Sequence, residues 1–274
     1  MSVPAAQAPA SGAGAAGEQL LAARALSVRF GGVRALDGLD LTVSPGEVLG
    51  LIGPNGSGKT TFFNAVTGFV TPAGGEVLLG GENVTGLAPR HMARRGVART
   101  FQRLRLLLEL SVLDNLLLGL HLRLDHGPVA NLLARSRLRA ELERHTEAAR
   151  QLLGCFSPAL PGRLQEPAGA LTMIDRRRVE VCRALIGEPR LLLLDEPSAG
   201  MTPDETLELM GDLLTVKEQR PRLAVVLIEH DMAVIERVAS RCAVLDYGRK
   251  LCEGSYAEVT SDPAVRRAYL GEDV

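Results

Sequence analysis

Short runs of apolar residues, separated by stretches with a helical pattern, recur along this chain. Val48 to Ile52 is a continuous apolar run, as expected of a strand that is buried on both faces. Leu191–Leu194, Ala224–Ile228 and Ala243–Leu245 are similar runs with helical stretches between them. Because alternating strands and helices fold into a mostly parallel sheet covered by helices, we expect an α/β fold.

The segments on either side of the first run have shorter, alternating patterns. Ala25–Phe30 and Leu39–Val43 are split by Gly31-Gly32 and predict antiparallel strands. Glu76–Leu79 predicts another short strand, and Asn83–Arg95 predicts a helix. We therefore expect a small antiparallel β subdomain beside the main sheet.

The middle of the chain predicts helices. A leucine-rich stretch runs from Leu104 to Leu120, and Ser136–Leu153 places four apolar residues on one helical face: Leu138, Leu142, Ala149 and Leu153. We expect one globular domain over residues 20–270, with a helical subdomain inserted at about 103–185. Residues 1–19 are rich in Ala, Gly, Pro and Ser and predict a disordered tail.

Composition and charge exclude several classes of protein. With 46% hydrophobic residues among 274, the chain can bury a core, and its net charge of −1 argues against a nucleic-acid partner. No apolar run approaches the roughly 18 residues of a membrane-spanning helix, and the tail lacks the basic start of a signal peptide. The four cysteines form no CxxC pair, so free thiols in a reducing cytosol are expected.

A glycine-rich loop follows the run at 48–52 and leads into a helical stretch. It comprises Gly53, Pro54, Asn55, Gly56, Ser57, Gly58, Lys59 and Thr60, and Thr61 continues it into the helix. Strand, glycine loop and helix in this order form the P-loop, or Walker A motif, whose backbone N–H groups bind phosphates. We expect Lys59 to reach the β- and γ-phosphates and the Thr60 hydroxyl to ligate Mg²⁺. The sequence therefore predicts a site for ATP or GTP.

Two further strand ends carry candidate catalytic residues. The run at 191–194 ends in Asp195 and Glu196, as in a Walker B strand. Asp195 is expected to hold Mg²⁺, directly or through water, and Glu196 to act as general base for the attacking water. His230 follows the run at 224–228, and strand ends of such sheets form the ligand crevice. We expect His230 to hydrogen-bond the γ-phosphate and to position the water.

Together these residues resemble the ATP-binding subunits of ABC transporters over nearly the whole chain. The resemblance implies that Gln102, in Arg99-Thr100-Phe101-Gln102, belongs to the Q-loop and contacts Mg²⁺ and water. It also implies a D-loop at 198–201 and an H-loop at 228–231. Phe30 matches the aromatic position that stacks on adenine, which favours ATP, although an ordinary core residue of a strand is an equal alternative.

Finer matches are similar to the subunits that energise branched-chain amino-acid uptake. They are Arg29–Gly32, Val97–Gln102 and the tail Ala268–Asp273. Urea-uptake subunits share most of these features, and lipopolysaccharide-export ATPases share the tail but usually lack the Arg-Thr-Phe run. The transported solute therefore stays open, and an ATPase of another ABC transporter or a nucleotide-binding subunit with weak turnover is an alternative. A soluble ABC protein of DNA repair or translation is disfavoured, because neither a second ATPase domain nor a long coiled coil is visible.

The resemblance also implies partners and a location. Such subunits lie at the cytoplasmic face of the cell membrane, bound to integral membrane permeases and served indirectly by a solute-binding protein. The stretch from Leu104 to Leu120 is the candidate docking surface, unless it forms the core of the helical subdomain. In the family, each ATP lies between the Walker motifs of one ATPase subunit and a Leu-Ser-x-Gly-Gln signature of the other.

This signature is degenerate here, since the aligned segment is Leu171 followed by Thr172, Met173, Ile174 and Asp175. Thr172 keeps the hydroxyl for the γ-phosphate, but Ile174 replaces the glycine whose bare backbone approaches that phosphate. Asp175 adds a negative charge near the partner's nucleotide, where repulsion is costly. We therefore expect a heterodimer, in which a second ATPase subunit supplies the intact signature.

Overall fold

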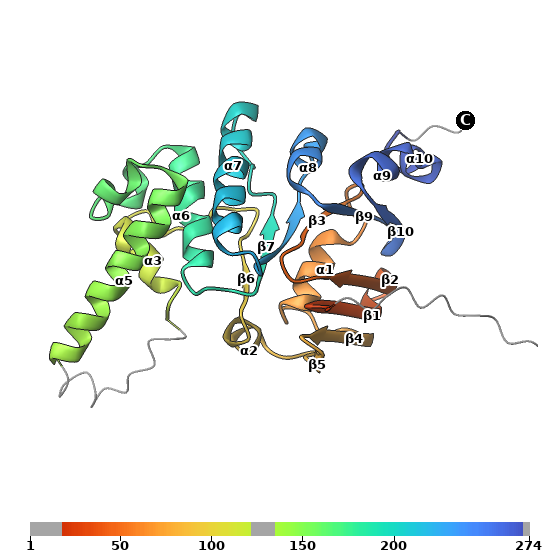
Figure 1. Ribbon diagram of the computed structural model, residues 1–274. Coiled ribbons are helices and arrows are strands. Elements are labelled where there is room, and N and C mark those ends of the chain that lie inside the picture. Colours follow the sequence, from red (N-terminus) through yellow and green to blue (C-terminus); the bar gives the residue numbers. More distant parts are fainter. Residues whose placement is uncertain (1–17, 122–134, 271–274) are drawn as a thin grey trace, which may run out of the picture.

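The computed structural model describes residues 18–121 and 135–270 (Figure 1). The predicted tail lies outside this part except for residues 18 and 19, as do the last three residues of the Ala268–Asp273 motif. Two sheets and a set of helices make up the described chain. None of the helices between residues 18 and 121 or between 135 and 270 combines the length and apolar character needed to cross a bilayer.

The main sheet has six strands in the order β10-β9-β3-β8-β7-β6. All neighbours pair in parallel except β10 and β9. The strands are β3 (Val48–Ile52), β6 (Val97–Arg99), β7 (Leu191–Asp195), β8 (Ala224–Ile228), β9 (Arg241–Asp246) and β10 (Arg249–Gly254). The expected parallel α/β sheet is thus confirmed, and its parallel strands bring the ends of β3, β7 and β8 to one edge.

The second sheet has four antiparallel strands in the order β2-β1-β4-β5. They are β1 (Leu21–Phe30), β2 (Val33–Val43), β4 (Gly74–Leu79) and β5 (Glu82–Asn83). The predicted helix from Asn83 is wrong over its first part, because Asn83 pairs with Leu78 and Gly86 then turns the chain at φ 70°. Helix α2 covers only Pro89–Arg94, where proline occupies the first turn.

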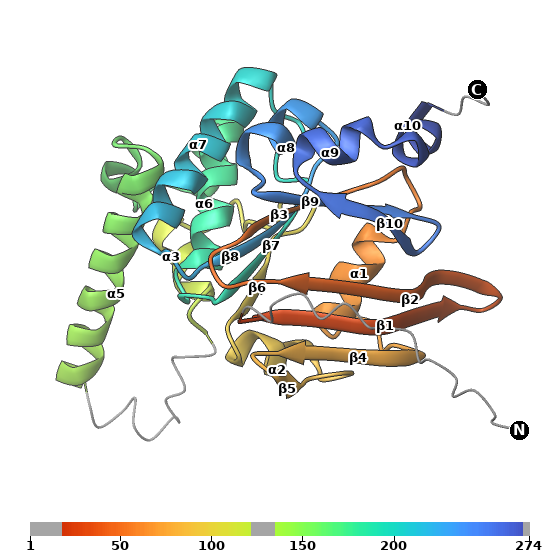
Figure 2. The ribbon, with the colours of Figure 1, turned by 45° about the vertical axis from the view of Figure 1, so that its right-hand side comes forward.

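The main sheet has a different layer on each face. Leu191 and Leu193 of β7 pack toward the antiparallel sheet and helix α1 (Lys59–Val66), whereas Leu192 and Leu194 pack toward the remaining helices. Figure 2 shows α1 between the two sheets. Side chains alternate across a strand, so a run that is apolar at every position is what this two-sided burial requires.

The helices on the other face continue the domain. α7 (Pro203–Gln219) and α8 (Met232–Val238) flank the main sheet, and the chain ends in α9 (Tyr256–Ser261) and α10 (Pro263–Leu270). α3, α5 and α6 gather at one end of the molecule (Figure 1), with short 3₁₀ turns between α5 and α6. Their bounds are Val112–Leu118, Arg135–Phe156 and Met173–Leu185.

The expected apolar face of α5 is wrong at one position. Ala149 and Leu153 are fully buried, but Leu142 is 50% exposed. None of the residues from 139 to 148 is buried, because this half of α5 extends beyond the helices that cover its C-terminal half (Figure 2). The side chain of Leu138 lies outside the described part.

Candidate active site

The glycine loop connects the end of β3 to the first turn of α1. Gly53, Gly56 and Gly58 all have positive φ angles, which disfavour residues with a Cβ. A Cβ on Gly53 would lie 2.1 Å from the carbonyl oxygen of Leu245, and one on Gly58 would lie 2.7 Å from that of Ala35. The glycines therefore allow the tight turn that joins β3 to the start of α1, the arrangement in which the backbone N–H groups of a P-loop bind phosphates.

Lys59 lies inside this loop. Its Nζ donates hydrogen bonds to the carbonyl oxygens of Gly53 at 2.6 Å and Pro54 at 2.9 Å. Burial lowers the pKa of Lys59, and the nearby negative charges of Glu196 and Asp195 act against that shift. The only ammonium group of the loop thus lies beside the two carboxylates at the end of β7.

Asp195 is held by an arginine from the neighbouring strand. Arg99 Nη2 lies 2.6 Å from Asp195 Oδ2, and Arg99 Nη1 donates to Asn64 Oδ1 of α1 at 2.7 Å. The guanidinium also lies over the rings of Phe63 and Phe101, 5.4 and 5.0 Å from their centroids. The sequence singled out Arg99 only as part of a family pattern, and it did not predict this contact because the two residues are far apart in the chain.

Glu196 is the point at which three predicted catalytic residues meet. Its Oε2 accepts a hydrogen bond from Gln102 Nε2 at 2.7 Å, and its Oε1 lies 2.6 Å from His230 Nε2. Glu196 has φ 49°, a left-handed conformation that costs about 1–3 kcal/mol in a residue other than glycine. Its backbone N–H donates to the carbonyl oxygen of Ile228 at 3.0 Å, which anchors this turn to β8.

Glu229 lies in the H-loop expected from the sequence, which assigned it no role. Its carboxylate is buried and accepts hydrogen bonds from the Ser198 backbone N–H at 3.0 Å and the Ser198 hydroxyl at 2.7 Å. Burial raises the pKa of Glu229, whereas these hydrogen bonds lower it. Glu229 thereby ties the loop after Glu196 to the strand end that carries His230.

The donor set fits Mg²⁺ held mainly by phosphates and water. Thr60, Gln102 and Asp195 offer a hydroxyl, an amide and a carboxylate oxygen, the hard ligands that Mg²⁺ prefers. No cluster of three or more His, Cys, Asp or Glu residues suited to a metal occurs in the described chain. Mg²⁺ usually needs only one or two protein carboxylates together with substrate phosphates, so Asp195 is sufficient.

Phe30 ends β1 and is 51% exposed. The alternative of an ordinary core residue is therefore wrong. Gly31, with φ 58°, turns the chain directly after it. An exposed aromatic side chain next to a turn is available to stack on a base, which keeps the adenine prediction open.

The degenerate signature begins α6. The Thr172 hydroxyl accepts a hydrogen bond from the Asp175 backbone N–H at 3.3 Å and so caps the helix. Thr172 and Met173 are exposed, but Ile174 is only 8% exposed. The side chain of Ile174 thus packs into its own chain. The direct clash with a partner's phosphate that the sequence predicted therefore does not follow from this side chain.

The charge of Asp175 is partly offset by two arginines of its own chain, which also pair with other carboxylates. Its Oδ1 lies 3.2 Å from Arg178 Nη1, and its Oδ2 lies 3.6 Å from Arg163 Nη1. Arg178 contacts two further carboxylates, those of Glu208 and Asp212. Two arginines beside Asp175 weaken the repulsion that its charge alone would exert on a triphosphate.

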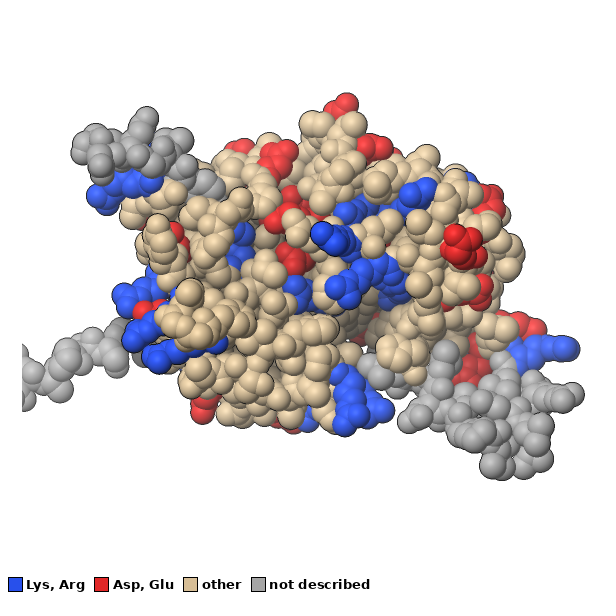
Figure 3. Space-filling view, turned by 180° about the vertical axis from the view of Figure 1, so that it is seen from behind, with Lys and Arg blue, Asp and Glu red and all other residues tan. Residues whose placement is uncertain are grey.

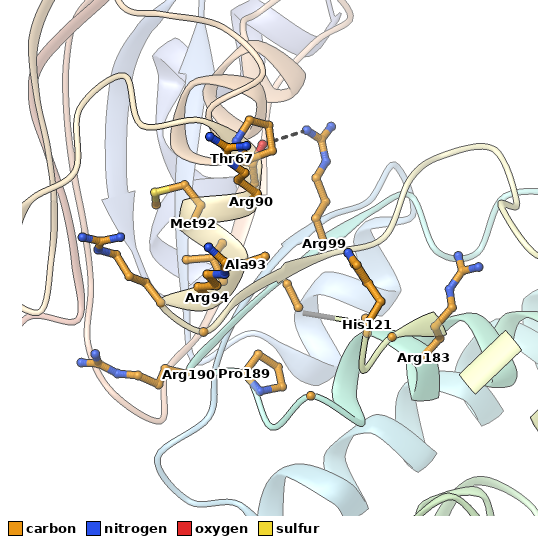
Figure 4. A pocket seen from close by; sticks show the side chains of 18 of the residues that line it. Thr67, Arg90, Met92, Ala93, Arg94, Arg99, His121, Arg183, Pro189 and Arg190 are labelled. Atoms are coloured by element: carbon orange, nitrogen blue, oxygen red, sulfur yellow. Dashed lines mark hydrogen bonds between the residues drawn. The ribbon is translucent and has the colours of Figure 1, made fainter. Parts of the chain in front are cut away.

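A groove of about 900 Å³ lies between α2 and β6 on one side and α3 and α6 on the other. Figure 4 shows Arg90, Arg94 and Arg190 along one side of it and Arg183 on the other. Seen from behind, Lys and Arg side chains gather near the middle of the molecule (Figure 3). The near-zero net charge therefore conceals a locally basic surface.

Comparison with known proteins identifies close relatives. Residues 36–199 match the family described as "ABC transporter", and residues 249–274 match "Branched-chain amino acid ATP-binding cassette transporter". The chain is 40% identical to the high-affinity branched-chain amino acid transport ATP-binding protein LivG of Escherichia coli K12, over 93% of this chain and 99% of LivG. It is 37% identical to the corresponding protein BraF of Pseudomonas aeruginosa, over 92% and 98%.

A solved structure has the same fold. The crystal structure of a nucleotide-free ATP-binding cassette from an ABC transporter superposes with a TM-score of 0.79 at 30% identity. The superposition covers 93% of this chain and 100% of the solved one.

Proposed function

We propose that this chain, which belongs to the ATP-binding subunits of ABC transporters, powers the import of branched-chain or related amino acids. Within that family it belongs to the branched-chain amino-acid group. It is a nucleotide-binding protein and an ATPase. The main support for catalysis of ATP hydrolysis is that the side chains of Gln102 and His230 both contact the carboxylate of Glu196, beside the P-loop. Urea uptake is the alternative for the solute, and a subunit with weak turnover is the alternative for the activity.

In the proposed mechanism, the loop N–H groups and Lys59 bind the phosphates of ATP and stabilise the charge that develops on the transferred group. Bound Mg²⁺ would neutralise phosphate charge, contacted by Thr60, Asp195 and Gln102. Glu196 accepts the proton of the attacking water. Gln102 and His230 keep its carboxylate aimed at that water, because each holds one of its two oxygens.

We assign the arginine-lined groove to a permease segment. Arg95, which directly follows α2, lies 3.9 Å from a carboxylate oxygen of Glu82, whereas Arg90 and Arg94 of α2 have no carboxylate within ion-pair distance among the described residues. Exposed Phe69 and Leu118 add apolar surface to the same groove. An acidic segment with a few apolar side chains would complement it.

The groove revises the docking surface expected from the sequence. Only Leu118 and Gly119 of the stretch from Leu104 to Leu120 line it. Leu106, Leu116 and Leu120 are buried in the helical region, as the alternative predicted, whereas Leu107, Leu108, Leu110 and Leu118 are exposed. We propose that docking places the chain at the cytoplasmic face of the membrane, with a solute-binding protein acting indirectly through the permease.

We further propose a heterodimer with a second ATPase subunit. The support is the altered signature, in which Ile174 and Asp175 replace Gly and Gln, so that two copies of this chain would give two incomplete ATP sites. A partner with an intact signature would complete the site built on Lys59 and Glu196.

Transport can be tested with the assembled complex. The chain is co-expressed with candidate permeases and a candidate second ATPase subunit, and the complex is reconstituted into vesicles with a candidate solute-binding protein. We expect ATP-dependent uptake of labelled leucine, isoleucine or valine. ATP-dependent uptake of urea without uptake of these amino acids would overturn the solute. Failure of the permeases to co-purify would overturn the assembly.

A further inference from the structure

We propose that Arg177 is a positioning residue for hydrolysis, which ties the signature helix to both loops that surround Glu196. Arg177 lies in the second turn of α6 and is 3% exposed. Its Nη2 donates hydrogen bonds to the carbonyl oxygens of Gln102 at 3.1 Å and Ala199 at 3.0 Å. Its Nη1 donates to Glu180 Oε2 at 2.9 Å. A single guanidinium thus joins three separate segments.

The two carbonyl groups belong to loops that contact Glu196 directly. The side chain of Gln102 donates to Glu196 Oε2, so the position of its backbone determines whether the amide can reach that oxygen. The Ala199 backbone N–H donates to the carbonyl oxygen of Glu196 at 3.1 Å, which closes the turn that holds Glu196 at φ 49°. Arg177 therefore fixes the surroundings of the carboxylate from both sides without touching it.

The chemistry of the contact requires arginine. The guanidinium is planar and rigid, so it can hold two carbonyls and a carboxylate at once, whereas the ammonium of lysine has one nitrogen on a flexible chain. Both side chains of the Arg177–Glu180 pair are almost fully buried, at 4% and 3% exposure. Each charge needs the other, because an unpaired buried charge is strongly unfavourable.

Glu180 extends this network in two directions. Its Oε1 accepts a hydrogen bond from the Arg105 backbone N–H at 2.9 Å, just after the Q-loop. Glu180 also lines the arginine-rich groove, on the same helix as Arg183. One ion pair thus connects the surface proposed for the permease with the loops at Glu196.

The test uses the complex of the full-length chain with the second ATPase subunit, in which hydrolysis is expected to be fast, and compares Arg177→Lys with Arg220→Lys. Arg220 is a matched control, because it donates to the carbonyl oxygen of Leu185 at the opposite end of α6, at 2.9 Å. We measure the ATP dissociation constant, the single-turnover hydrolysis rate and amide hydrogen exchange. For Arg177→Lys we expect unchanged ATP affinity, a rate lowered about 10²-fold, as misplaced catalytic groups produce, and faster exchange confined to 100–104 and 197–201. Arg220→Lys should keep the wild-type rate and exchange in both loops.

Glu180→Gln is the second variant, since it keeps the shape of the side chain but removes the charge that holds Arg177. It should change the rate and the exchange of the same two loops in the same direction. A wild-type rate with unchanged loop exchange in Arg177→Lys would overturn the proposal. So would a general rise in exchange with loss of ATP binding, which a purely structural role predicts. The proposal rests on hydrolysis and not on the transported solute, and the exchange measurement needs neither transport nor turnover.

Discussion

Arg99 and Asp195 form an ion pair in which Nη2 lies 2.6 Å from Oδ2 and each side chain is only 6% exposed. The pair joins the end of β6 to the end of β7, and Asn64 links the same arginine to α1. The carboxylate at the end of the Walker B strand is thus oriented by an arginine of the neighbouring strand. An exposed carboxylate would have no such restraint.

This contact predicts a large loss of stability on Arg99→Met. Removing one partner of a buried ion pair leaves the other charge uncompensated, which costs about 3–5 kcal/mol. Urea denaturation of the full-length chain measures the free energy of unfolding. The control is Arg222→Met, because Arg222 pairs with Glu18 while 74% exposed, and such surface pairs contribute at most about 1 kcal/mol. Equal losses in the two variants would contradict the importance of burial.

Lys59→Ala should abolish ATP binding or turnover. The substitution removes the cation that faces the β- and γ-phosphates, and no other lysine lies in the loop. Isothermal titration calorimetry with ATP and a phosphate-release assay measure the two effects. Lys217→Ala, on α7, serves as control and should bind and hydrolyse ATP normally. Near-normal ATP affinity and turnover in Lys59→Ala would contradict the assignment of residues 53–60 as the phosphate-binding loop.

Glu196→Gln should retain ATP binding but slow hydrolysis by about 10²–10⁴-fold, the contribution typical of a general base. The amide keeps one oxygen for hydrogen bonding but cannot accept the proton of water. Binding is measured by calorimetry and hydrolysis in a single turnover, with Asp204→Asn as control because Asp204 is exposed in the first turn of α7. Unchanged turnover in Glu196→Gln would show that another group is the base.

The sequence predicted those parts of the fold and site that are contiguous in the chain. Apolar residues at every position from 191 to 194 indicated a strand buried on both faces, and the P-loop carries its chemistry within one short segment. The contact of Arg177 with Gln102 spans 75 residues, and the contact of Arg99 with Asp195 spans 96, so neither was visible in any local pattern. Such contacts depend on strand order, which the sequence did not define.

The direction of side chains at the start of α6 was the second feature that the sequence did not predict. The aligned position of Ile174 indicated a residue facing the partner's nucleotide, but the first turn of α6 directs this side chain inward and leaves Met173 exposed. Likewise, the charge of Asp175 suggested repulsion, while Arg178, only three residues later, offsets it. Helical geometry places residues three apart on one face, so this second pairing was foreseeable from the sequence.

The signature segment therefore gives the sharpest test of the heterodimer. ATPase rates are measured for the isolated chain, for its complex with the second ATPase, and for the complex carrying Ile174→Gly with Asp175→Gln. If an intact signature donates a hydrogen bond to the transition state, loss of that donor lowers the hydrolysis rate about 10²–10³-fold. The isolated chain should hydrolyse slowly, the complex faster, and the restored signature should accelerate the second site as well.

Two single variants separate the causes. Because Asp175 is already paired with two arginines, Asp175→Gln alone should change the rate little. Ile174→Gly alone frees the backbone at the helix start, but glycine also costs about 1 kcal/mol in a helix, so the free energy of unfolding is measured in parallel. Fast turnover by the isolated chain, or no gain from the double variant at unchanged stability, would mean that this signature is not deficient. The asymmetric heterodimer would then lose its physical basis, since two copies of this chain could form two complete sites.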